Sequence, residues 1–357
     1  MRGFKPTAIR DLRPTTRNQG KGATDMSATT ATPRPAPTTS LLKRTVGDRP
    51  IVAFFVLAFL GGWTVLLPTV LLESGFGLVP VSLPAPAVML LFIPAAMAGP
   101  ALAAFVVTGI VEGKEGAREL LRRRVLRWRV GIRWYLIAIF GVPIVYFVAS
   151  SFVLGAAPLE ALIEEWPLIF TSYLPKVVMV FLIVSLWEEI GWMGFALPRL
   201  QEEYGPLMAS MVLGALWALW HLPAYFNSTQ VVEDKVGLGD LDRLLYLLPL
   251  LILLATSTRI VMTWLFNRAM GSVIVVTLFH AGFNISNNEL ITNFMPQMNR
   301  IFANYEWMYA VSGVLALLLI VFTKGRLSNK AEHTAPPQDA SSSKVERRVS
   351  GARTPSA

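Results

Sequence analysis

The sequence predicts an all-α, polytopic membrane protein, and three observations lead to this prediction. The chain has 357 residues, of which 54% are hydrophobic and only 15% are charged, against about 25% charged residues in an ordinary soluble domain. Its mean hydropathy of +0.52 is higher than the surface of a soluble globule can accommodate. The apolar residues also form long uninterrupted runs, which indicate helices that cross a bilayer. These properties exclude an average soluble enzyme.

Eight apolar segments are long enough, or nearly so, to span a bilayer, which takes about 20 apolar residues. They are residues 51–72, 85–110, 134–154, 177–197, 206–222, 244–266, 272–286 and 307–322. We therefore predict one helical membrane domain over residues 50–323. On either side of it, residues 1–48 form a basic tail and residues 324–357 a second polar tail. Both are predicted to be disordered, because they contain too little apolar surface to offset chain entropy.

The distribution of Lys and Arg orients the predicted spans. The two tails and the loops on one side contain 27 of these residues, whereas the loops on the opposite side contain 4. Because positive residues are retained on the cytosolic side, about eight crossings with both termini in the cytosol explain this split. The net charge of +9 then reflects orientation in the membrane, and no nucleic-acid partner is expected. We expect an integral, multi-pass protein of a bacterial cell membrane.

A strongly basic segment, residues 111–133, joins the second and third predicted spans. Five arginines crowd one side of a helix here, and leucines and a tryptophan line the other side. This pattern is typical of an interfacial helix that binds anionic lipids. Docking of a partner or of nucleic acid is the alternative interpretation of the same charges.

Ionisable residues inside membrane spans are costly and therefore mark candidate functional sites. Glu188 and Glu189 are adjacent in the fourth span, so their side chains point about 100° apart on a helix. Two charges this close in a low dielectric suit a general acid or base. The alternative is a helix end at which both carboxylates simply reach water.

Two histidines lie in other apolar segments. His221 follows Trp217 by one helical turn, and His280 precedes Asn284 by one turn, so that each pair shares a helix face. A single histidine in an apolar helix is often a packing residue. Two of them beside an amide and a carboxylate pair could instead hold a water or a metal for hydrolysis. The chain contains no cysteine, which excludes thiolate metal sites and a catalytic thiol.

At these stretches the sequence resembles the CPBP family of intramembrane metalloproteases. The family includes the type II CaaX prenyl endopeptidases and bacterial Abi-type bacteriocin-immunity proteins. Its pattern is Glu-Glu-x-x-x-Arg, then an aromatic residue four positions before a His, then His-x-x-x-Asn. Here these motifs read Glu188 to Met193, Trp217 to His221, and His280 to Asn284. The resemblance covers residues 111–290, with the core motifs in 177–290.

The resemblance implies an intramembrane endopeptidase that acts on a membrane-associated or prenyl-type peptide or protein. Its catalytic residues would be Glu188, Glu189, His221, His280 and Asn284. Glu188 would act as general base with help from His221, and His280 and Asn284 would stabilise the oxyanion. Alternatively, Glu188, His221 and His280 would hold one divalent metal, such as zinc. No other cofactor is expected.

The sequence departs from the family pattern at two positions. Trp217 replaces the usual phenylalanine and keeps an aromatic wall. Met193 replaces the arginine of the first motif, which leaves Glu189 without its neighbouring cation. We expect Arg259, which lies inside the sixth span, or Arg199 to supply that charge.

Three alternatives to a protease follow from the same residues. A non-catalytic scaffold or bacteriocin-immunity protein would keep the fold, and Met193 favours it. A bis-histidine haem or quinone carrier would use His221 and His280, but the adjacent glutamates argue against it. A proton-coupled transporter would use the buried carboxylates, but the sequence shows no internal repeat that supports one.

Overall fold

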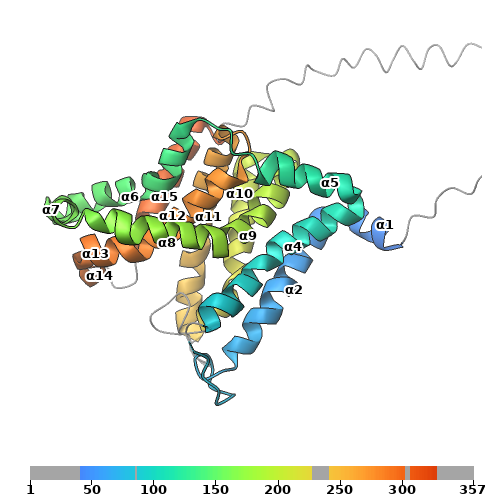
Figure 1. Cartoon of the computed structure of the whole chain (residues 1–357), viewed down its shortest axis with the longest axis horizontal. Helices are drawn as coiled ribbons and strands as arrows, with labels where there is room; N and C mark the ends of the chain where they lie inside the picture. The colour runs from blue at the N-terminus through green and yellow to red at the C-terminus, as the bar shows by residue number, and fades with distance from the viewer. Residues whose placement is uncertain (1–40, 85–86, 227–240, 302–305, 328–357) are drawn as a thin grey trace, which may run out of the picture. The chain divides into compact units, whose positions relative to one another are not determined.

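The chain folds as an all-helical protein, as the sequence predicts (Figure 1). The computed structural model describes residues 41–84, 87–226, 241–301 and 306–327, and within these ranges it contains helices and no strand. Five helical stretches are long and apolar enough to cross a membrane. They are Pro50–Val70, Leu90–Val111, Ile132–Leu154, Ile169–Phe226 and Leu244–Arg268, and Trp307–Thr323 is a shorter apolar helix. The protein is thus a polytopic all-α membrane protein.

The first three of these stretches are α2 (Pro50–Val70), α4 (Ile93–Val111) with the preceding η1 (Val88–Phe92), and α6 (Ile132–Leu154). They lie where the sequence predicts the first three spans. The predicted sixth and eighth spans correspond to α11 (Leu241–Arg268) and α15 (Glu306–Thr323). The predicted seventh span contains α12 (Val273–Ile285), which has 13 residues. The number of crossings and the cytosolic termini stay predictions.

The predicted fourth and fifth spans lie within one nearly continuous helical run, Ile169–Phe226. Its elements are η3 (Ile169–Tyr173), α8 (Leu174–Val180), η4 (Phe181–Ser185), α9 (Leu186–Glu189), η5 (Ile190–Ala196), α10 (Leu197–Trp220) and η6 (Leu222–Phe226). The two predicted spans are separated at Gly205, where φ is 73° and ψ is 167°. Only glycine adopts this backbone readily, and Pro206 then begins the second part of α10. The chain therefore bends between the two spans without a long loop.

The shorter elements connect the long helices. They are α5 (Gly113–Leu120) and η2 (Leu121–Val125) in the basic segment, α7 (Ala157–Glu164), and η7 (Ser286–Leu290), α13 (Ile291–Phe294) and α14 (Pro296–Ile301) after α12. The predicted N-terminal tail needs a correction at its end, because residues Leu41–Asp48 form helix α1, which packs on α4. The remaining tail residues, 1–40 and 328–357, lie outside the described residues.

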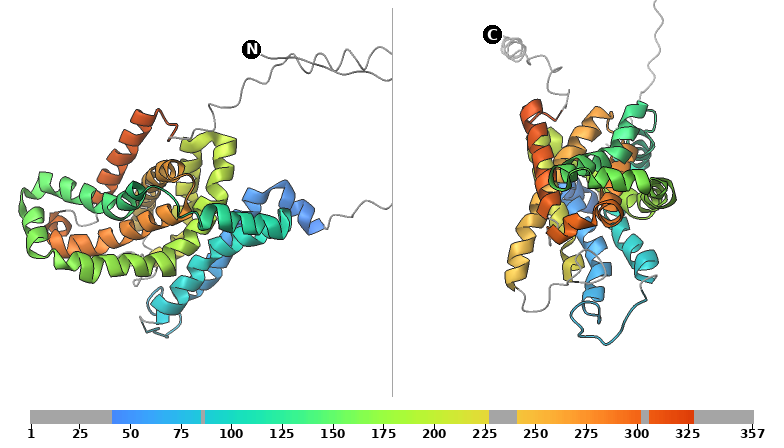
Figure 2. Two further views of the ribbon diagram at one scale, coloured as in Figure 1. Left: turned by 45° about the horizontal axis from the view of Figure 1, so that its top comes forward. Right: turned by 90° about the vertical axis from the view of Figure 1, so that its left-hand side faces the viewer.

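The long helices pack in pairs, most extensively α2 with α4, α10 with α11, α12 with α6 and α11 with α15. Figure 2 shows α2 and α4 running side by side. Small residues permit this close packing, as is common between membrane helices. Gly99 of α4 lies against Gly61 and Gly62 of α2, and Gly214 of α10 lies against the backbone of Thr256 in α11.

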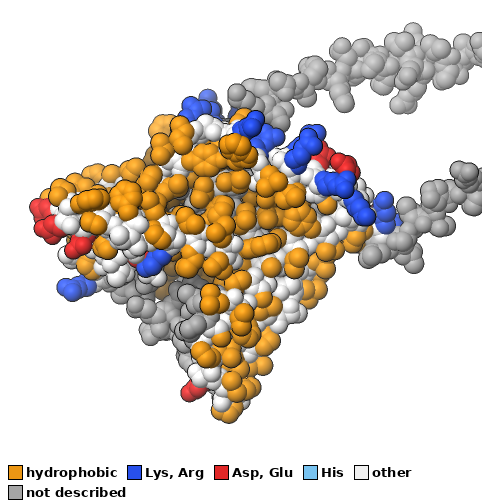
Figure 3. All heavy atoms as spheres, viewed as in Figure 1, with side chains coloured by type: hydrophobic (Ala, Val, Ile, Leu, Met, Phe, Trp, Pro, Cys, Tyr) orange, Lys and Arg blue, Asp and Glu red, His pale blue; other side chains and the backbone are white. Residues whose placement is uncertain are grey.

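The outer surface carries many large apolar side chains. Hydrophobic residues cover most of the face seen in Figure 3, and the charged side chains lie near its edges. Among the exposed residues are Phe152 of α6 and Phe322 of α15, with 87% and 80% of their surface accessible. A patch this extensive would be unstable in water. It is the expected surface of a protein that contacts lipid tails.

The close contact at Gly214 predicts a specific loss of stability. A Cβ atom on Gly214 would lie 2.5 Å from Cα of Thr256, so the Gly214→Ala variant must push α10 away from α11. We expect a loss of about 1–3 kcal/mol, the usual cost of overpacking, measured as a lower Tm in detergent. Gly109→Ala is the control, because nothing lies within 4 Å of a Cβ there. Equal Tm values for both variants would contradict the predicted contact.

Candidate active site

The two glutamates lie at the C-terminal end of α9, deep inside the protein. Glu188 is 1% exposed and Glu189 is fully buried. The alternative of a helix end in water is therefore wrong. The π-helical segment η5 follows directly, and such widened turns are frequent at functional sites. Gly191 in η5 permits close contact with Pro100, because a Cβ atom would lie 2.6 Å from the carbonyl oxygen of Pro100.

Glu189 forms a buried ion pair with Arg259 of α11. The Arg259 Nη1 atom lies 2.5 Å from Oε2 of Glu189, and both side chains are fully buried. The other carboxylate oxygen, Oε1, lies 2.8 Å from Nδ1 of His280 in α12. Because a carboxylate only accepts hydrogen bonds, Nδ1 of His280 carries the proton. Both oxygens of Glu189 are thus engaged, and the carboxylate orients His280.

Arg259 therefore supplies the cation that the motif lacks at Met193. The expected pairing with Glu189 is confirmed for Arg259 and not for Arg199, which binds Glu112 instead, at 2.6 Å. Met193 is fully buried in the hydrophobic core. The signal in the sequence was a single arginine inside an otherwise apolar span, where an unpaired charge would be very costly.

Glu188 has a different environment. Its Oε2 atom accepts a hydrogen bond from Nε1 of Trp217, at 2.7 Å. Among the residues that the structure describes, Trp217 is the one hydrogen-bond donor to Glu188. The Oε1 atom of Glu188 is therefore available to a water, a metal ion or a substrate. The adjacent glutamates thus differ: Glu189 binds two other side chains, whereas Glu188 binds one among the described residues.

Trp217 has a larger role than the aromatic wall expected from the sequence. Besides its bond to Glu188, its ring lies beneath the Arg259 guanidinium, with Cζ 4.2 Å from the ring centroid. The same ring meets the His280 imidazole edge-to-face at 5.3 Å. A phenylalanine could make the two ring contacts but could not donate to Glu188. The sequence-based prediction missed this contact, and the indole N–H, a donor that phenylalanine lacks, is the feature that could have suggested it.

His221 ends α10, and its Nδ1 atom lies 2.9 Å from the carbonyl oxygen of Trp217. Since a carbonyl only accepts, Nδ1 is protonated and Nε2 carries the lone pair. The position of this helix end is set by Trp220. Its Nε1 atom donates to the carbonyl of Ala58 at 3.1 Å, and its own carbonyl accepts from Trp63 at 2.9 Å. These two bonds tie α10 to α2.

His280 is 1% exposed, and Asn284 is half-buried one turn later on α12. Ser272 begins this helix, and its hydroxyl accepts a hydrogen bond from the Val275 N–H at 3.4 Å. The same hydroxyl donates to the carbonyl of Arg127 at 2.6 Å. The basic segment is thus connected directly to the helix that carries His280.

Glu188, Glu189 and His280 each offer a ligand atom, and these atoms all lie within 4.8 Å of one another. This buried group could hold a metal ion. The group contains Glu189 and not His221, which is the third ligand predicted from the sequence. Both oxygens of Glu189 already bind Arg259 and His280, and a nearby guanidinium repels a divalent cation. Glu188 and Nε2 of His280 are therefore the better donors.

The comparisons with known proteins agree with this geometry. Residues 170–286 match the family described as type II CAAX prenyl endopeptidase Rce1-like, and all the candidate catalytic residues lie in this range. The chain is also 27% identical over 216 residues to CAAX prenyl protease 2 of Methanococcus maripaludis, which covers 57% of this chain and 73% of that protein. Both matches support the predicted CPBP, type II CAAX protease family.

The buried ion pair of this CAAX-protease-like core gives a testable prediction. In the Arg259→Met variant, Glu189 becomes an uncompensated buried charge, and breaking a buried pair costs about 3–5 kcal/mol. We expect a large drop in Tm or in the amount of folded protein. The second substitution Met193→Arg restores the family pattern and should recover part of the loss.

The matched control is Arg118→Met, because Arg118 and its partner Glu115 are 74% and 83% exposed. Exposed pairs contribute at most about 1 kcal/mol, so this variant should resemble the wild type. Arg259→Met with wild-type Tm would show that Glu189 does not depend on Arg259.

Proposed function

We propose that this protein is an intramembrane endopeptidase in which Glu188 activates a water molecule. The observation that carries the proposal is the different engagement of the two glutamates. Glu189 is fully used in holding Arg259 and His280, whereas Glu188 keeps one oxygen free in the same buried cluster. A carboxylate in such a place is suited to accept a proton from water.

The proposed reaction follows from the hydrogen bonds. Glu188 removes a proton from the water, with Nε2 of His221 as a second acceptor, and the water oxygen bonds to the peptide carbonyl carbon. In its protonated form, His280 offers Nε2–H to the oxyanion, and its charge is stabilised by Glu189 at Nδ1. The Asn284 amide is the second proposed donor to the oxyanion. When the C–N bond breaks, Glu188 returns the proton to the leaving amine.

A bound divalent metal such as zinc would polarise the peptide carbonyl and lower the pKa of the attacking water. Glu188 and His280 are the residues that we propose would hold it, with His221 as the expected third ligand. Arg259 and Glu189 would then keep His280 in the orientation and tautomer that ligation needs.

For the substrate we propose a membrane-associated peptide with a prenyl-type C-terminus. The support for this class is the Rce1-like match over residues 170–286 and the relative named as a CAAX prenyl protease. The alternative, a non-catalytic scaffold, drew its support from Met193. Arg259 now provides the missing positive charge to Glu189, which removes that support.

The test is cleavage of a prenylated peptide by the purified full chain in detergent. Glu188→Gln removes the proposed base and should lower kcat by about 10²–10⁴-fold, without a change in Tm larger than that of the control. The control is Glu115→Gln, an exposed position on α5. A chelator added to the wild type separates the two mechanisms. Loss of activity that zinc restores indicates a metal, and no effect indicates glutamate alone. Glu188→Gln with wild-type kcat would refute the proposed role.

We further propose that the basic segment 111–133 binds anionic lipid. The helical part of the segment ends at Val125 and does not continue as predicted. Arg122 and Arg123 in η2 are exposed, and so are Leu126 and Trp128 directly after it, as expected for a segment at a lipid headgroup layer. Arg124 lies over the Phe266 ring at 5.8 Å, which anchors the segment on α11. Its arginines thus face both the protein and the proposed lipid.

This proposal predicts a lipid-dependent stability. Phosphatidylglycerol should raise the Tm of the wild type more than that of the variant with Arg122→Gln and Arg123→Gln, and 0.5 M salt should reduce the difference because it screens exposed charges. Arg300→Gln, an exposed arginine on α14, is the control. An equal response of all three proteins would contradict the assignment.

A further inference from the structure

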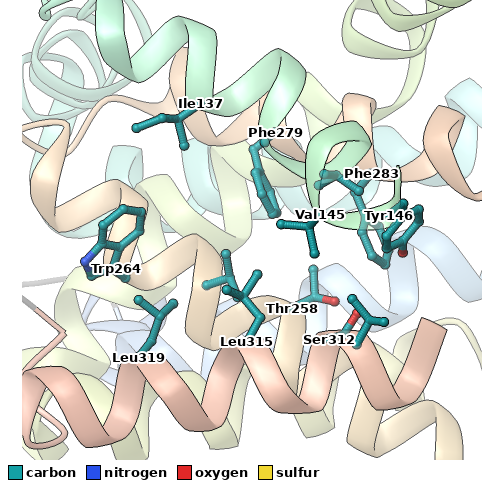
Figure 4. Close-up of a pocket in the computed structure, with 14 residues that line it drawn as sticks. Ile137, Val145, Tyr146, Thr258, Trp264, Phe279, Phe283, Ser312, Leu315 and Leu319 are labelled. Atoms are coloured by element: carbon teal, nitrogen blue, oxygen red, sulfur yellow. The ribbon is translucent and has the colours of Figure 1, made fainter. Parts of the chain in front are cut away.

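A cavity lies away from the catalytic cluster, between α6 and α15 (Figure 4). Its volume is about 190 Å³. Val145 of α6 and Leu315 of α15 form its two half-exposed walls, and Val261 of α11 and Phe279 of α12 form its buried floor. We call this cavity the α6–α15 groove. For comparison, an apolar cavity of about 150 Å³ stays dry and binds benzene.

The groove has one polar end. Tyr146, Thr258 and Ser312 lie together at one end of it, whereas Ile137, Trp264 and Leu319 lie at the other (Figure 4). Thr258 is 2% exposed, and its hydroxyl has no hydrogen-bond partner among the described residues. Leaving a buried hydroxyl unpaired destabilises the folded protein. A ligand oxygen at this end would remove that cost.

The groove is distinct from the catalytic site. None of the five candidate catalytic residues lines it. Helix α12 separates the two, because His280 contacts Glu189 while the neighbouring Phe279 and Phe283 line the groove. The shared helices nevertheless connect them, since Thr258 in the groove directly precedes Arg259 of the buried ion pair.

We propose that the α6–α15 groove binds one acyl chain of a bilayer phospholipid, whose ester oxygen accepts a hydrogen bond from Thr258. The walls continue directly into surface that faces lipid tails, since Ile144 and Val148 on α6 and Val314 and Leu318 on α15 are all exposed. From Ile137 to Tyr146 the groove extends about 13 Å along α6, at 1.5 Å per residue. A long hydrocarbon chain with an oxygen at one end fits both the length and the polarity.

The occupant would be a bilayer lipid and not the lipid tail of a substrate, because α12 lies between the groove and the catalytic glutamates. A bound chain would fill the gap between α6 and α15, which make few contacts with each other. It would thereby hold α11 and α12, and with them Arg259 and His280, in their observed packing. The inference concerns binding alone and does not depend on the proposed protease activity.

The test uses the full chain, delipidated in detergent, with phosphatidylcholine added as the probe. Phosphatidylcholine carries no net charge, so the basic segment does not contribute. Native mass spectrometry should show one retained phospholipid, and the Tm should rise with lipid concentration. Gly141→Leu fills the groove, because a Cβ atom at Gly141 meets only Ile137, at 3.6 Å. This variant should lose the retained lipid and at least half of the rise in Tm.

The matched control is Gly109→Leu, which places the same side chain on α4 where nothing lies within 4 Å of a Cβ. It should retain the lipid as the wild type does. If Gly141→Leu binds phosphatidylcholine as tightly as Gly109→Leu does, the groove is not the site and the proposal is overturned.

A second variant tests the polar end. Thr258→Val removes a hydroxyl that lacks a partner, so without lipid its Tm should equal or exceed that of the wild type. With phosphatidylcholine, its affinity should be at least threefold weaker. An unchanged affinity would overturn the hydrogen bond to Thr258. A single-chain isoprenoid alcohol is the competing probe, and if it binds where phosphatidylcholine does not, the acyl-chain assignment is wrong.

Discussion

The ion pair between Arg259 and Glu189 is the interaction on which the rest of the site depends. Both charges are fully buried, 70 residues apart in sequence, in a protein whose outer surface is apolar. Neither charge would be tolerated alone in such a medium. Because Glu189 also holds Nδ1 of His280, one carboxylate joins α9, α11 and α12. Any change that separates these helices would leave the charges of Glu189 and Arg259 uncompensated and the His280 imidazole misoriented.

Trp217 extends this arrangement to Glu188, the proposed general base. Its indole N–H binds Glu188, while its ring contacts Arg259 and His280. A guanidinium over an aromatic face gains energy that increases when water is excluded. The replacement of two family residues, an arginine by Met193 and a phenylalanine by Trp217, can thus be understood together. The positive charge comes from Arg259 on α11, and Trp217, whose ring contacts Arg259, also donates a hydrogen bond to Glu188.

The scaffold around the site depends on close backbone approach, which small residues permit. Gly191 lets η5 contact Pro100 of α4, and Gly214 lets α10 contact Thr256 of α11. In hydrocarbon, helix association gains little from the hydrophobic effect and rests on packing and hydrogen bonds. Buried tryptophans add such bonds, as at Trp220, whose N–H binds the carbonyl of Ala58. The gap between α6 and α15 is a place in the described part of the chain where this packing is incomplete.

The sequence by itself determined the all-α membrane class, the positions of most long helices and the candidates Glu188, Glu189 and His280, which the structure brings together. It could do so because run length and charge cost are local properties of the chain. It also identified Arg259 as a candidate partner of Glu189. It did not distinguish Arg259 from Arg199, because that choice depends on which helices pack together. The separate environments of Glu188 and Glu189, the bond from Trp217 and the joining of two predicted spans at Gly205 were decided by tertiary structure. Glu188 and Glu189 are adjacent and share the same local sequence, so only contacts with residues on distant helices can give their carboxylates different environments.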